Sequence, residues 1–289
     1  MGVTEVIKPN FFIIGAMKAG TTSLHYYLNQ HPQIFMSDPK ELWYFVKEKN
    51  WSKGNDWYLD HFHNVSTEVI IGESCPDYTM LPKYQGVAER LHRFNPTSKL
   101  VYILRDPVER VISHYWYNVR LAGEQRDILT AVWEEPNMLQ VSNYSLQLKE
   151  YLRFFPRENI YLLTFEELIS DIKKHVREIT DWLNLDELQF PIDEGKKNVT
   201  PQRLKQPKGK ALLHKLRYSN AWSKVSCFTP KHIRKLANII AYREVDKIEE
   251  TPVEVYNYLR NQLKHSVEEL KQLAKRDFFD WKTFYNTKT

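Results

Sequence analysis

Four short apolar runs occur along the chain, at residues 11–14, 69–71, 100–104 and 160–163. Each run is almost wholly hydrophobic instead of alternating with polar positions, and the first two end at a glycine. Short continuous runs of this kind are typical of strands that are buried on both faces of a sheet. Helical patterns lie between the runs, so the sequence predicts an α/β fold with a central parallel sheet flanked by helices.

The segments between the runs carry helix signals. Residues 24–30 have apolar side chains at helical spacing, and Pro32 follows that segment. After the third run, Asp106 is placed as an N-cap with Pro107 at the first helical position. Two further helices are expected around residues 146–155 and over residues 252–273.

One stretch differs from the rest in composition. Residues 194–210 are polar, rich in lysine and interrupted by Pro201 and Pro207. We interpret this stretch as a mobile loop rather than a domain linker, because too little chain follows it to form a second α/β domain. The expected organisation is therefore a single domain over residues 1–289, long enough to bury a substantial core.

Composition and charge exclude some classes of protein. Lys and Arg number 41 against 36 Asp and Glu, and the net charge of +5 is weaker than that of a dedicated nucleic-acid binder. We expect no nucleic-acid partner.

No apolar run approaches the length needed to cross a bilayer, and the first eight residues do not resemble a signal peptide, so the sequence predicts a soluble protein. Cys75 and Cys227 provide no disulfide framework; two reduced thiols are favoured, and one bridge stays open.

The loop after the first run, residues 15–23 (GAMKAGTTS), carries the clearest chemistry. A glycine-containing loop between a strand and a helix directs backbone N–H groups and the helix dipole toward one point, which favours anions. The usual nucleoside-triphosphate loop places Lys directly after its second Gly, whereas here Lys18 precedes Gly20. The candidate phosphate ligands are Lys18, Ala19, Gly20, Thr21, Thr22 and Ser23.

A second candidate anion site follows the third run. Arg105 comes at the end of the predicted strand, and Ser113 lies two helical turns into the following helix. An arginine can bind a phosphate through two hydrogen bonds while a serine hydroxyl donates another. Taken singly, Arg105 could instead pair with Asp106 or Glu109, and Ser113 could be an ordinary helix residue. Arg110 and His114, nearby, are interpreted as packing or surface residues.

With both motifs in this order, the chain resembles the sulfotransferases that use 3′-phosphoadenosine 5′-phosphosulfate (PAPS). The first loop resembles their 5′-phosphosulfate loop, Lys-x-Gly-Thr-[ST], and Arg105 and Ser113 match their 3′-phosphate site. The sequence of residues 15–24 is most similar to the Golgi carbohydrate branch, which includes the heparan sulfate N- and 3-O-sulfotransferases, and to its bacterial relatives. The resemblance runs from residue 11 to residue 168 and continues weakly to residue 281.

The resemblance also indicates a catalytic base. In the heparan sulfate enzymes a Lys-Glu-x-x-x-Phe segment at this place carries the catalytic glutamate, and Glu41 matches it. A solvated loop charge is the alternative for Glu41. Trp43 and Val46 stand where the 3-O-enzymes have a histidine and an aspartate, so an identical proton relay is not implied. Glu73, at the end of the second run, is a rival base, with a structural hydrogen bond to the nearby loop as its other interpretation.

The function implied is direct, in-line transfer of a sulfuryl group from PAPS to a hydroxyl or amine, with Lys18 and Glu41 as catalytic residues, 3′-phosphoadenosine 5′-phosphate (PAP) as product and no metal. The resemblance implies a saccharide acceptor and leaves the oligomeric state open. A kinase with a variant phosphate loop and a non-catalytic nucleotide- or glycan-binding protein are the alternatives.

Lys208 and Lys210 resemble a nucleotide-closing loop, although solvated charges are favoured there. We expect a cytoplasmic enzyme; a Golgi-lumenal catalytic domain without its anchor is the alternative. The aromatic residues that could stack on sugars or belong to the core are Trp43, Tyr44, Trp51, Trp57 and Tyr58.

Overall fold

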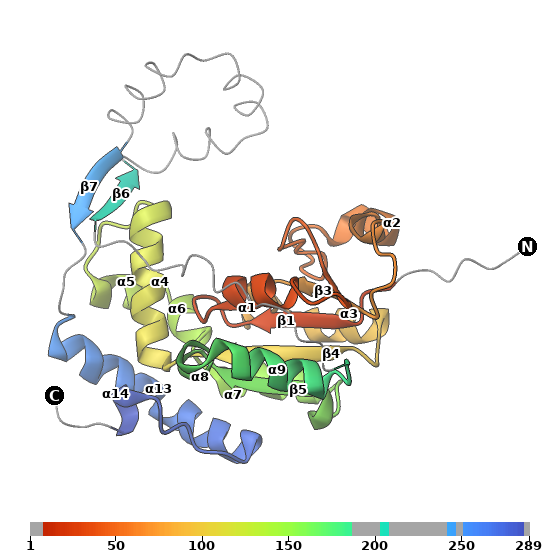
Figure 1. Cartoon of the computed structure of the whole chain (residues 1–289). Helices are drawn as coiled ribbons and strands as arrows, with labels where there is room; N and C mark the ends of the chain where they lie inside the picture. Colours follow the sequence, from red (N-terminus) through yellow and green to blue (C-terminus); the bar gives the residue numbers. More distant parts are fainter. Residues whose placement is uncertain (1–7, 187–202, 208–241, 247–250, 286–289) are drawn as a thin grey trace, which may run out of the picture.

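A five-stranded parallel sheet forms the centre of the protein (Figure 1). The structure, a computed structural model, describes residues 8–186, 203–207, 242–246 and 251–285. The strand order is β2-β3-β1-β4-β5, and every pairing in this sheet is parallel. The strands are β1 (Phe11–Gly15), β2 (Ile34–Met36), β3 (Ile70–Ser74), β4 (Lys99–Leu104) and β5 (Ile160–Thr164).

The four predicted strands are confirmed as β1, β3, β4 and β5, and the sheet also contains β2, which the sequence analysis missed. β2 has three residues and lies at the edge of the sheet. A run this short gives no periodicity to detect, and its pairing with β3 is set by the fold as a whole.

The helices cover both faces of this sheet, as predicted. They are α1 (Thr21–Leu28), α2 (Gly54–Leu59), α3 (Val87–Phe94), α4 (Pro107–Leu121), α5 (Ile128–Glu134), α6 (Asn137–Gln140), α7 (Tyr144–Leu152), α8 (Phe165–Ser170), α9 (Ile172–Trp182), α13 (Val253–Ala274) and α14 (Lys282–Tyr285). Short 3₁₀ helices lie at Trp51–Lys53, Asp60–Phe62, Pro76–Thr79 and Arg157–Asn159. α1 contacts α9, whereas α3 and α13 contact α7. The α/β fold class is therefore confirmed.

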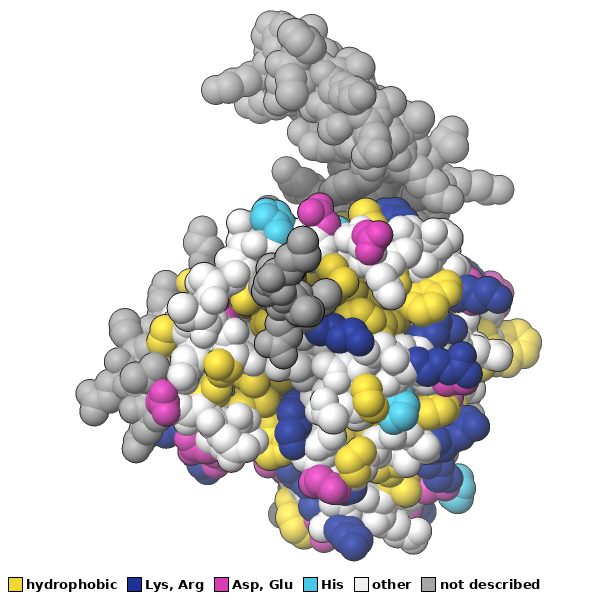
Figure 2. Space-filling model, turned by 90° about the vertical axis from the view of Figure 1, so that its right-hand side faces the viewer, with side chains coloured by type: hydrophobic (Ala, Val, Ile, Leu, Met, Phe, Trp, Pro, Cys, Tyr) yellow, Lys and Arg dark blue, Asp and Glu magenta, His cyan; other side chains and the backbone are white. Residues whose placement is uncertain are grey.

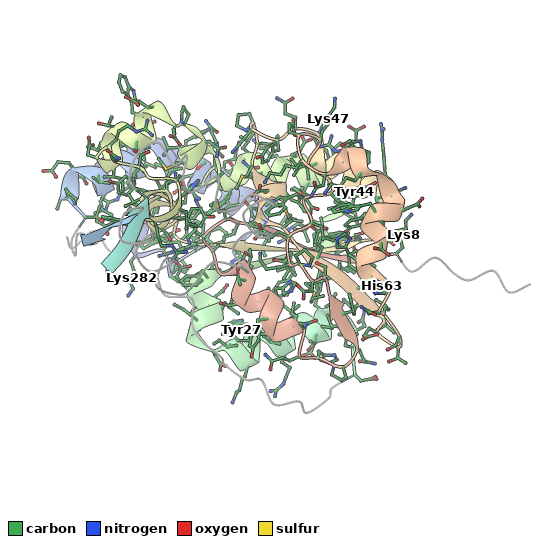
Figure 3. The ribbon with its side chains drawn as sticks, turned by 90° about the horizontal axis from the view of Figure 1, so that it is seen from above. Lys8, Tyr27, Tyr44, Lys47, His63 and Lys282 are labelled. Carbon is green, nitrogen blue, oxygen red and sulfur yellow. The ribbon has the colours of Figure 1, made fainter. Side chains whose placement is uncertain are left out.

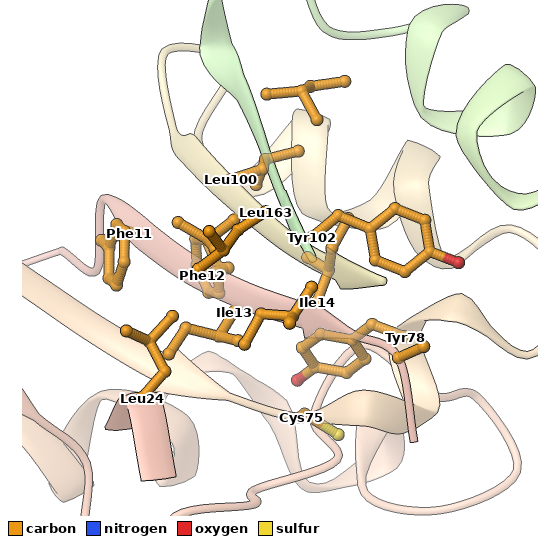
Figure 4. Packing of buried hydrophobic residues seen from close by; sticks show 14 of the residues in the cluster. Phe11, Phe12, Ile13, Ile14, Leu24, Cys75, Tyr78, Leu100, Tyr102 and Leu163 are labelled. Atoms are coloured by element: carbon orange, nitrogen blue, oxygen red, sulfur yellow. The ribbon is translucent and has the colours of Figure 1, made fainter. Parts of the chain in front are cut away.

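The core is built around β1. Phe11, Phe12, Ile13 and Ile14 are all 0% exposed, because helices cover both faces of the central strand. Figure 4 shows these side chains against Leu100 and Tyr102 of β4 and Leu163 of β5. A strand buried on both faces holds the loop that follows it in a fixed position, which matters because that loop carries the first anion motif.

The order of the strands brings two loops together. After β1 the chain builds β2 and β3 on one side of β1, and then crosses to form β4 and β5 on the other side. The loops that follow β1 and β4 therefore leave neighbouring strands in opposite directions. Such a point at the carboxyl edge of a parallel sheet is where α/β proteins bind ligands.

The C-terminal part of the described chain packs on α4 and α7. The helix predicted over residues 252–273 is confirmed as α13, whose inner side buries Leu259, Leu263 and Leu270. Trp281 is 0% exposed and stacks on Phe278, with ring centroids 4.3 Å apart. This segment therefore forms part of the main core.

The predicted loop at residues 194–210 is described only in part. Residues Arg203–Pro207 form β6, which pairs antiparallel with β7 (Tyr242–Asp246) and lies beside α4 (Figure 1). These five residues were expected to belong to a loop, and they form a strand instead. Lys208, Lys210 and Cys227 lie outside the described residues. Cys75 is a buried free thiol.

The sequence also led to expectations about membrane-spanning segments and about surface charge. Within the described ranges, none of the helices combines the length and the apolar character that a membrane crossing needs. On the face seen in Figure 2, Lys and Arg side chains lie among apolar, acidic and uncharged ones. A mixed surface of this kind agrees with the modest net charge of +5.

Asp106 provides a test of how the C-terminal segment is attached. Its buried carboxylate caps α4 by accepting from the N–H groups of Val108 (3.1 Å) and Glu109 (3.4 Å). It also accepts from the N–H (3.0 Å) and the hydroxyl (2.6 Å) of Thr283. Asp106→Ala should lower the free energy of unfolding by about 2–4 kcal/mol, because the cap is lost and buried donors are left unpaired.

Urea denaturation measures this effect, with Asp127→Ala as the matched control. Asp127 caps α5 from an exposed position and accepts from the N–H and the hydroxyl of Thr130, so its loss should cost about 1 kcal/mol. Equal losses in the two variants would contradict a structural role for the Thr283 contact.

Candidate functional site

A pocket of about 800 Å³ lies at the carboxyl ends of the strands. The predicted site residues that line it are Lys18, Gly20, Thr21, Thr22, Ser23, Glu41, Arg105 and Ser113. Ala19 does not line the pocket; it is fully buried, and its N–H donates to the carbonyl of Ala16 at 3.1 Å. The structure thus brings both anion motifs and one candidate base to a single cavity.

The loop after β1 needs glycine at two places. At Gly15 a Cβ atom would lie 2.0 Å from Oγ1 of Thr79. Gly20 has a φ of +92°, and a Cβ there would lie 2.9 Å from the ring of Phe165. Gly20 is the N-cap of α1 and offers no side-chain cap, so the first N–H groups of the helix remain available to a ligand. This end of α1 is therefore suited to an anion.

Arg110 fixes the loop after β1 through a hydrogen bond to its backbone. Its guanidinium is fully buried and donates to the carbonyl of Met17 (3.4 Å), to Oγ of Ser142 (2.5 Å) and to the carbonyl of Met138. His114 lies 3.3 Å from it. Burial and the charge of Arg110 lower the pKa of His114 to about 2, so this imidazole is neutral. Arg110 and His114 are therefore packing residues, which was one of the two interpretations of their sequence positions.

Lys18 is the cation that reaches into the pocket from the loop. Its backbone has a φ of +72°, a conformation that non-glycine residues rarely adopt and that often occurs at functional sites. Burial, together with the charges of Arg120, Arg105 and Arg110, lowers the pKa of Lys18 to about 8. Positive charge is therefore concentrated at this point, and a bound anion would relieve the repulsion.

The second anion motif lies on the neighbouring wall. Arg105 donates to the carbonyl of Lys18 at 3.3 Å and lies over the ring of Phe165, 5.1 Å from its centroid. Its ion pair with Glu109 is long, at 3.8 Å, so the guanidinium is not committed to this carboxylate. Ser113 faces the same pocket from α4, and its hydroxyl forms no hydrogen bond with any residue the structure describes. Both side chains are available to a ligand.

The two candidate bases occupy different environments. Glu41 lines the pocket with 26% of its side chain exposed and pairs with Lys40 at 2.7 Å. Glu73 is fully buried and does not line the pocket. Its carboxylate accepts from the N–H of Leu42 at 2.9 Å and from the hydroxyls of Tyr58 and Tyr78, each at 2.9 Å. Glu73 thus makes the structural hydrogen bond that was its other interpretation, and it fixes the loop that carries Glu41.

The aromatic residues near Glu41 divide into two groups. Trp43 lines the pocket, and Nζ of Lys49 lies 4.5 Å from its ring centroid. Tyr44 instead stacks on Tyr58 in the core, with centroids 4.4 Å apart and planes inclined by 11°. Figure 3 shows Tyr44 beside α2, away from Tyr27, which lines the pocket from α1. Among the aromatic residues proposed for sugar stacking, the core interpretation is therefore right for Tyr44 and Tyr58.

The sequence analysis did not identify several pocket residues. Trp116, Tyr117 and Arg120 lie on the same side of α4 as Ser113, at helical spacings of three, four and seven residues. That spacing could have identified them once Ser113 was chosen. Apolar side chains of α8 and α9 also line the pocket. They are Phe165, Leu168, Ile169 and Ile172, and no periodicity or charge in the sequence marked them as pocket residues.

No metal centre is found in the described part of the chain. Within those ranges, no three His, Cys, Asp or Glu side chains lie close enough together to bind an ion. The chemistry that this pocket offers is cation-rich anion binding beside the carboxylates of Glu41, Asp77 and Glu109.

The comparison with known protein families agrees with this arrangement. The sequence profile described as "Sulfotransferase domain" matches residues 8–240, which is more than half of the chain. The chain therefore belongs to the sulfotransferase domain family, as the two anion motifs predicted. Enzymes of this family use PAPS as the sulfuryl donor.

Individual relatives refine this assignment. The membrane-associated sulfotransferase kil1 of Dictyostelium discoideum is 42% identical over 115 residues, which cover 39% of this chain and 23% of kil1. Heparan sulfate glucosamine 3-O-sulfotransferase 5 of Mus musculus is 29% identical over 191 residues, covering 61% of this chain and 54% of that enzyme. The matched part is thus about a quarter of the first relative and about half of the second.

A solved structure supports the fold over nearly the whole chain. The crystal structure of a sulfotransferase from Alicyclobacillus acidocaldarius has a TM-score of 0.71 at 25% identity, covering 96% of this chain and 100% of that one. The parallel sheet with helices on both faces is thus the fold of a sulfotransferase.

Replacing Glu73 with glutamine tests the cost of its burial. Burial raises the pKa of Glu73 to about 7 from an ordinary value of 4.5. The stabilisation from the protonated carboxyl is therefore complete below pH 4.5 and is lost as the pH rises through 7. Relative to Glu73→Gln, the unfolding free energy of the wild type should fall over this range by up to about 3 kcal/mol.

Urea denaturation at a series of pH values gives the comparison, with Glu48→Gln, an exposed residue of the same segment, as the control. Burial also raises the pKa of Glu166 to about 7, but Glu166 is present in every protein compared, so its contribution cancels. Parallel curves for wild type and Glu73→Gln would contradict the prediction.

Proposed function

We propose that this chain transfers the sulfuryl group of PAPS to a hydroxyl or amine of a saccharide acceptor. The observation that carries the proposal is that two separate cationic subsites and the Glu41 carboxylate line one pocket. Membership of the sulfotransferase domain family supports the donor.

The residues present fit a nucleotide with phosphate groups at two positions. Lys18 and the free N–H groups at the start of α1 would hold the 5′-phosphosulfate. Arg105 and Ser113 would hold the 3′-phosphate, because both line the pocket and the ion pair of Arg105 with Glu109 is long, at 3.8 Å. Phe165 and Leu168 supply an apolar wall beside them, which suits an uncharged ring. PAPS supplies a sulfuryl group already activated by its bond to phosphate.

The roles of the protein groups follow from their charges. Lys18 and the loop N–H groups stabilise the negative charge that develops on the phosphate oxygen as its bond to sulfur breaks. Glu41 accepts the proton of the acceptor hydroxyl or amine as the new bond to sulfur forms. The hydrogen bond from Leu42 N–H to Glu73 keeps the loop of Glu41 in place. Direct in-line transfer needs no covalent bond to the protein.

Support for a saccharide acceptor comes from the acceptor end of the pocket. Trp43 and Tyr117 line it together with the polar groups of Glu41 and Asp77. Sugar rings bind to sites that combine aromatic surfaces with polar side chains. The heparan sulfate enzyme matched above is named for a saccharide acceptor, and this chain shares 29% identity with it.

Calorimetric titration tests the donor. PAP should bind at least tenfold more tightly than AMP, which lacks the 3′-phosphate. Arg105→Ala should reduce the affinity for PAP to that for AMP and leave AMP nearly unchanged, because an arginine–phosphate hydrogen bond contributes about 1.5–3 kcal/mol. Arg93→Ala, in an exposed residue of α3, serves as the control. Strong binding of ATP–Mg with no effect of the 3′-phosphate would instead support the kinase alternative.

Incorporation of ³⁵S from labelled PAPS into desulfated heparan sulfate oligosaccharides tests the base and the acceptor. Glu41→Gln keeps the shape of the side chain but not its basicity, so the rate should fall about 10²–10⁴-fold. The affinity for PAP should change less than twofold, and Glu48→Gln should retain the wild-type rate. Full activity of Glu41→Gln would exclude its role as base. If PAP binds and no saccharide is sulfated, the acceptor proposal is wrong and the donor proposal stands.

A further inference from the structure

Arg120 is a cation of the pocket to which no role has yet been given. It lies near the end of α4, seven residues after Ser113, or about 10 Å along the helix axis. Both residues line the same pocket. Arg120 thus lies at a different position along the helix from the 3′-phosphate site proposed at Arg105 and Ser113. A cation near a helix C-terminus interacts favourably with the helix dipole, but this does not account for its place on the pocket wall.

The carboxylates of this pocket already have partners. Lys49 pairs with Asp77, Lys40 pairs with Glu41 at 2.7 Å, and Glu109 accepts a hydrogen bond from the hydroxyl of Tyr256 at 3.0 Å. Arg120 forms neither an ion pair nor a hydrogen bond with the residues that the structure describes. A half-buried guanidinium without a counter-charge, in a pocket that already contains Lys18, is costly unless an anion binds there.

Tyr117 indicates which part of the pocket Arg120 faces. Nζ of Lys18 lies 4.9 Å from the centroid of the Tyr117 ring. After burial, the strongest charge effects on the pKa of Tyr117 come from Glu41, which raises it, and Arg120, which lowers it. Arg120 is also the charge that most lowers the pKa of Lys18. Tyr117 and Arg120 are three residues apart on α4, so they are neighbours on the pocket wall, and Arg120 therefore lies near both Lys18 and Tyr117.

We propose that Arg120 binds the sulfonate oxygens of the donor, at the point where the sulfuryl group passes from phosphate to acceptor. This inference rests on the proposed function. During transfer the bond from sulfur to the phosphate oxygen breaks, the bond from sulfur to the acceptor forms, and the acceptor proton passes to Glu41. The remaining sulfonate oxygens carry negative charge throughout. A planar guanidinium has several N–H donors and can bind two such oxygens at once.

The two nucleotides provide a test that needs no acceptor, because PAP has every group of PAPS except the sulfonate. Calorimetric titration of Arg120→Met should show the dissociation constant for PAPS raised about tenfold or more, and that for PAP changed less than twofold. Arg120→Lys should give a smaller loss, because it keeps the charge and loses the paired donors. Arg105→Met is the matched control, and it should weaken both nucleotides equally.

The outcomes separate this inference from the proposed function. Selective loss of PAPS affinity supports it. Equal loss of both affinities, or no loss, overturns it; in the latter case Arg120 would be free for an anionic group on the acceptor. If the wild type binds neither nucleotide, the proposed function itself fails, and this inference with it. Circular dichroism melting of each variant shows that it is folded, and Arg120→Lys serves as the test if Arg120→Met does not fold.

Discussion

The arrangement of the pocket depends on one buried cation, Arg110, at the place where the loop after β1 meets α4. Its guanidinium is fully buried and is satisfied by carbonyl and hydroxyl oxygens instead of a carboxylate. Burial lowers the pKa of Arg110 to about 10, so it stays charged at neutral pH. An unneutralised charge beneath the loop raises the positive potential at Lys18, and the same hydrogen bonds fix the loop in place. One residue thus supports both the shape and the charge of the anion site.

The fold and the anion motifs were predictable for a common reason. β1 and β4 are buried on both faces, so their sequences are apolar without interruption and easy to identify. The residues that bind anions follow those strands directly, and their positions follow from the strand ends. β2 could not be predicted in this way, because three residues carry no periodicity and its place is decided by pairing with β3.

The parts of the site that the sequence left open or did not reveal depend on tertiary contacts. Glu41 and Glu73 are both carboxylates near strand ends or loops, and the sequence left open which of them is the base. The two carboxylates differ in their access to the pocket. Tyr58 and Tyr78, from two other segments, enclose Glu73, whereas Glu41 lines the pocket. Arg120 was missed for another reason: its charge resembles that of many helix residues until the helix face toward the pocket is known.

The C-terminal segment has a consequence for the order in which the protein is completed. Thr283 contacts Asp106 at the start of α4, Asp280 accepts from the hydroxyl of Thr164 at 2.6 Å, and Arg276 pairs with Glu167 at 2.7 Å. Asp106, Thr164 and Glu167 lie at the beginnings of α4 and α8, two helices that line the pocket. During synthesis on the ribosome, these helix starts emerge more than a hundred residues before their partners. A nascent chain can therefore form the sheet early, but the walls of its pocket gain their last supports only after residue 283 has left the ribosomal tunnel.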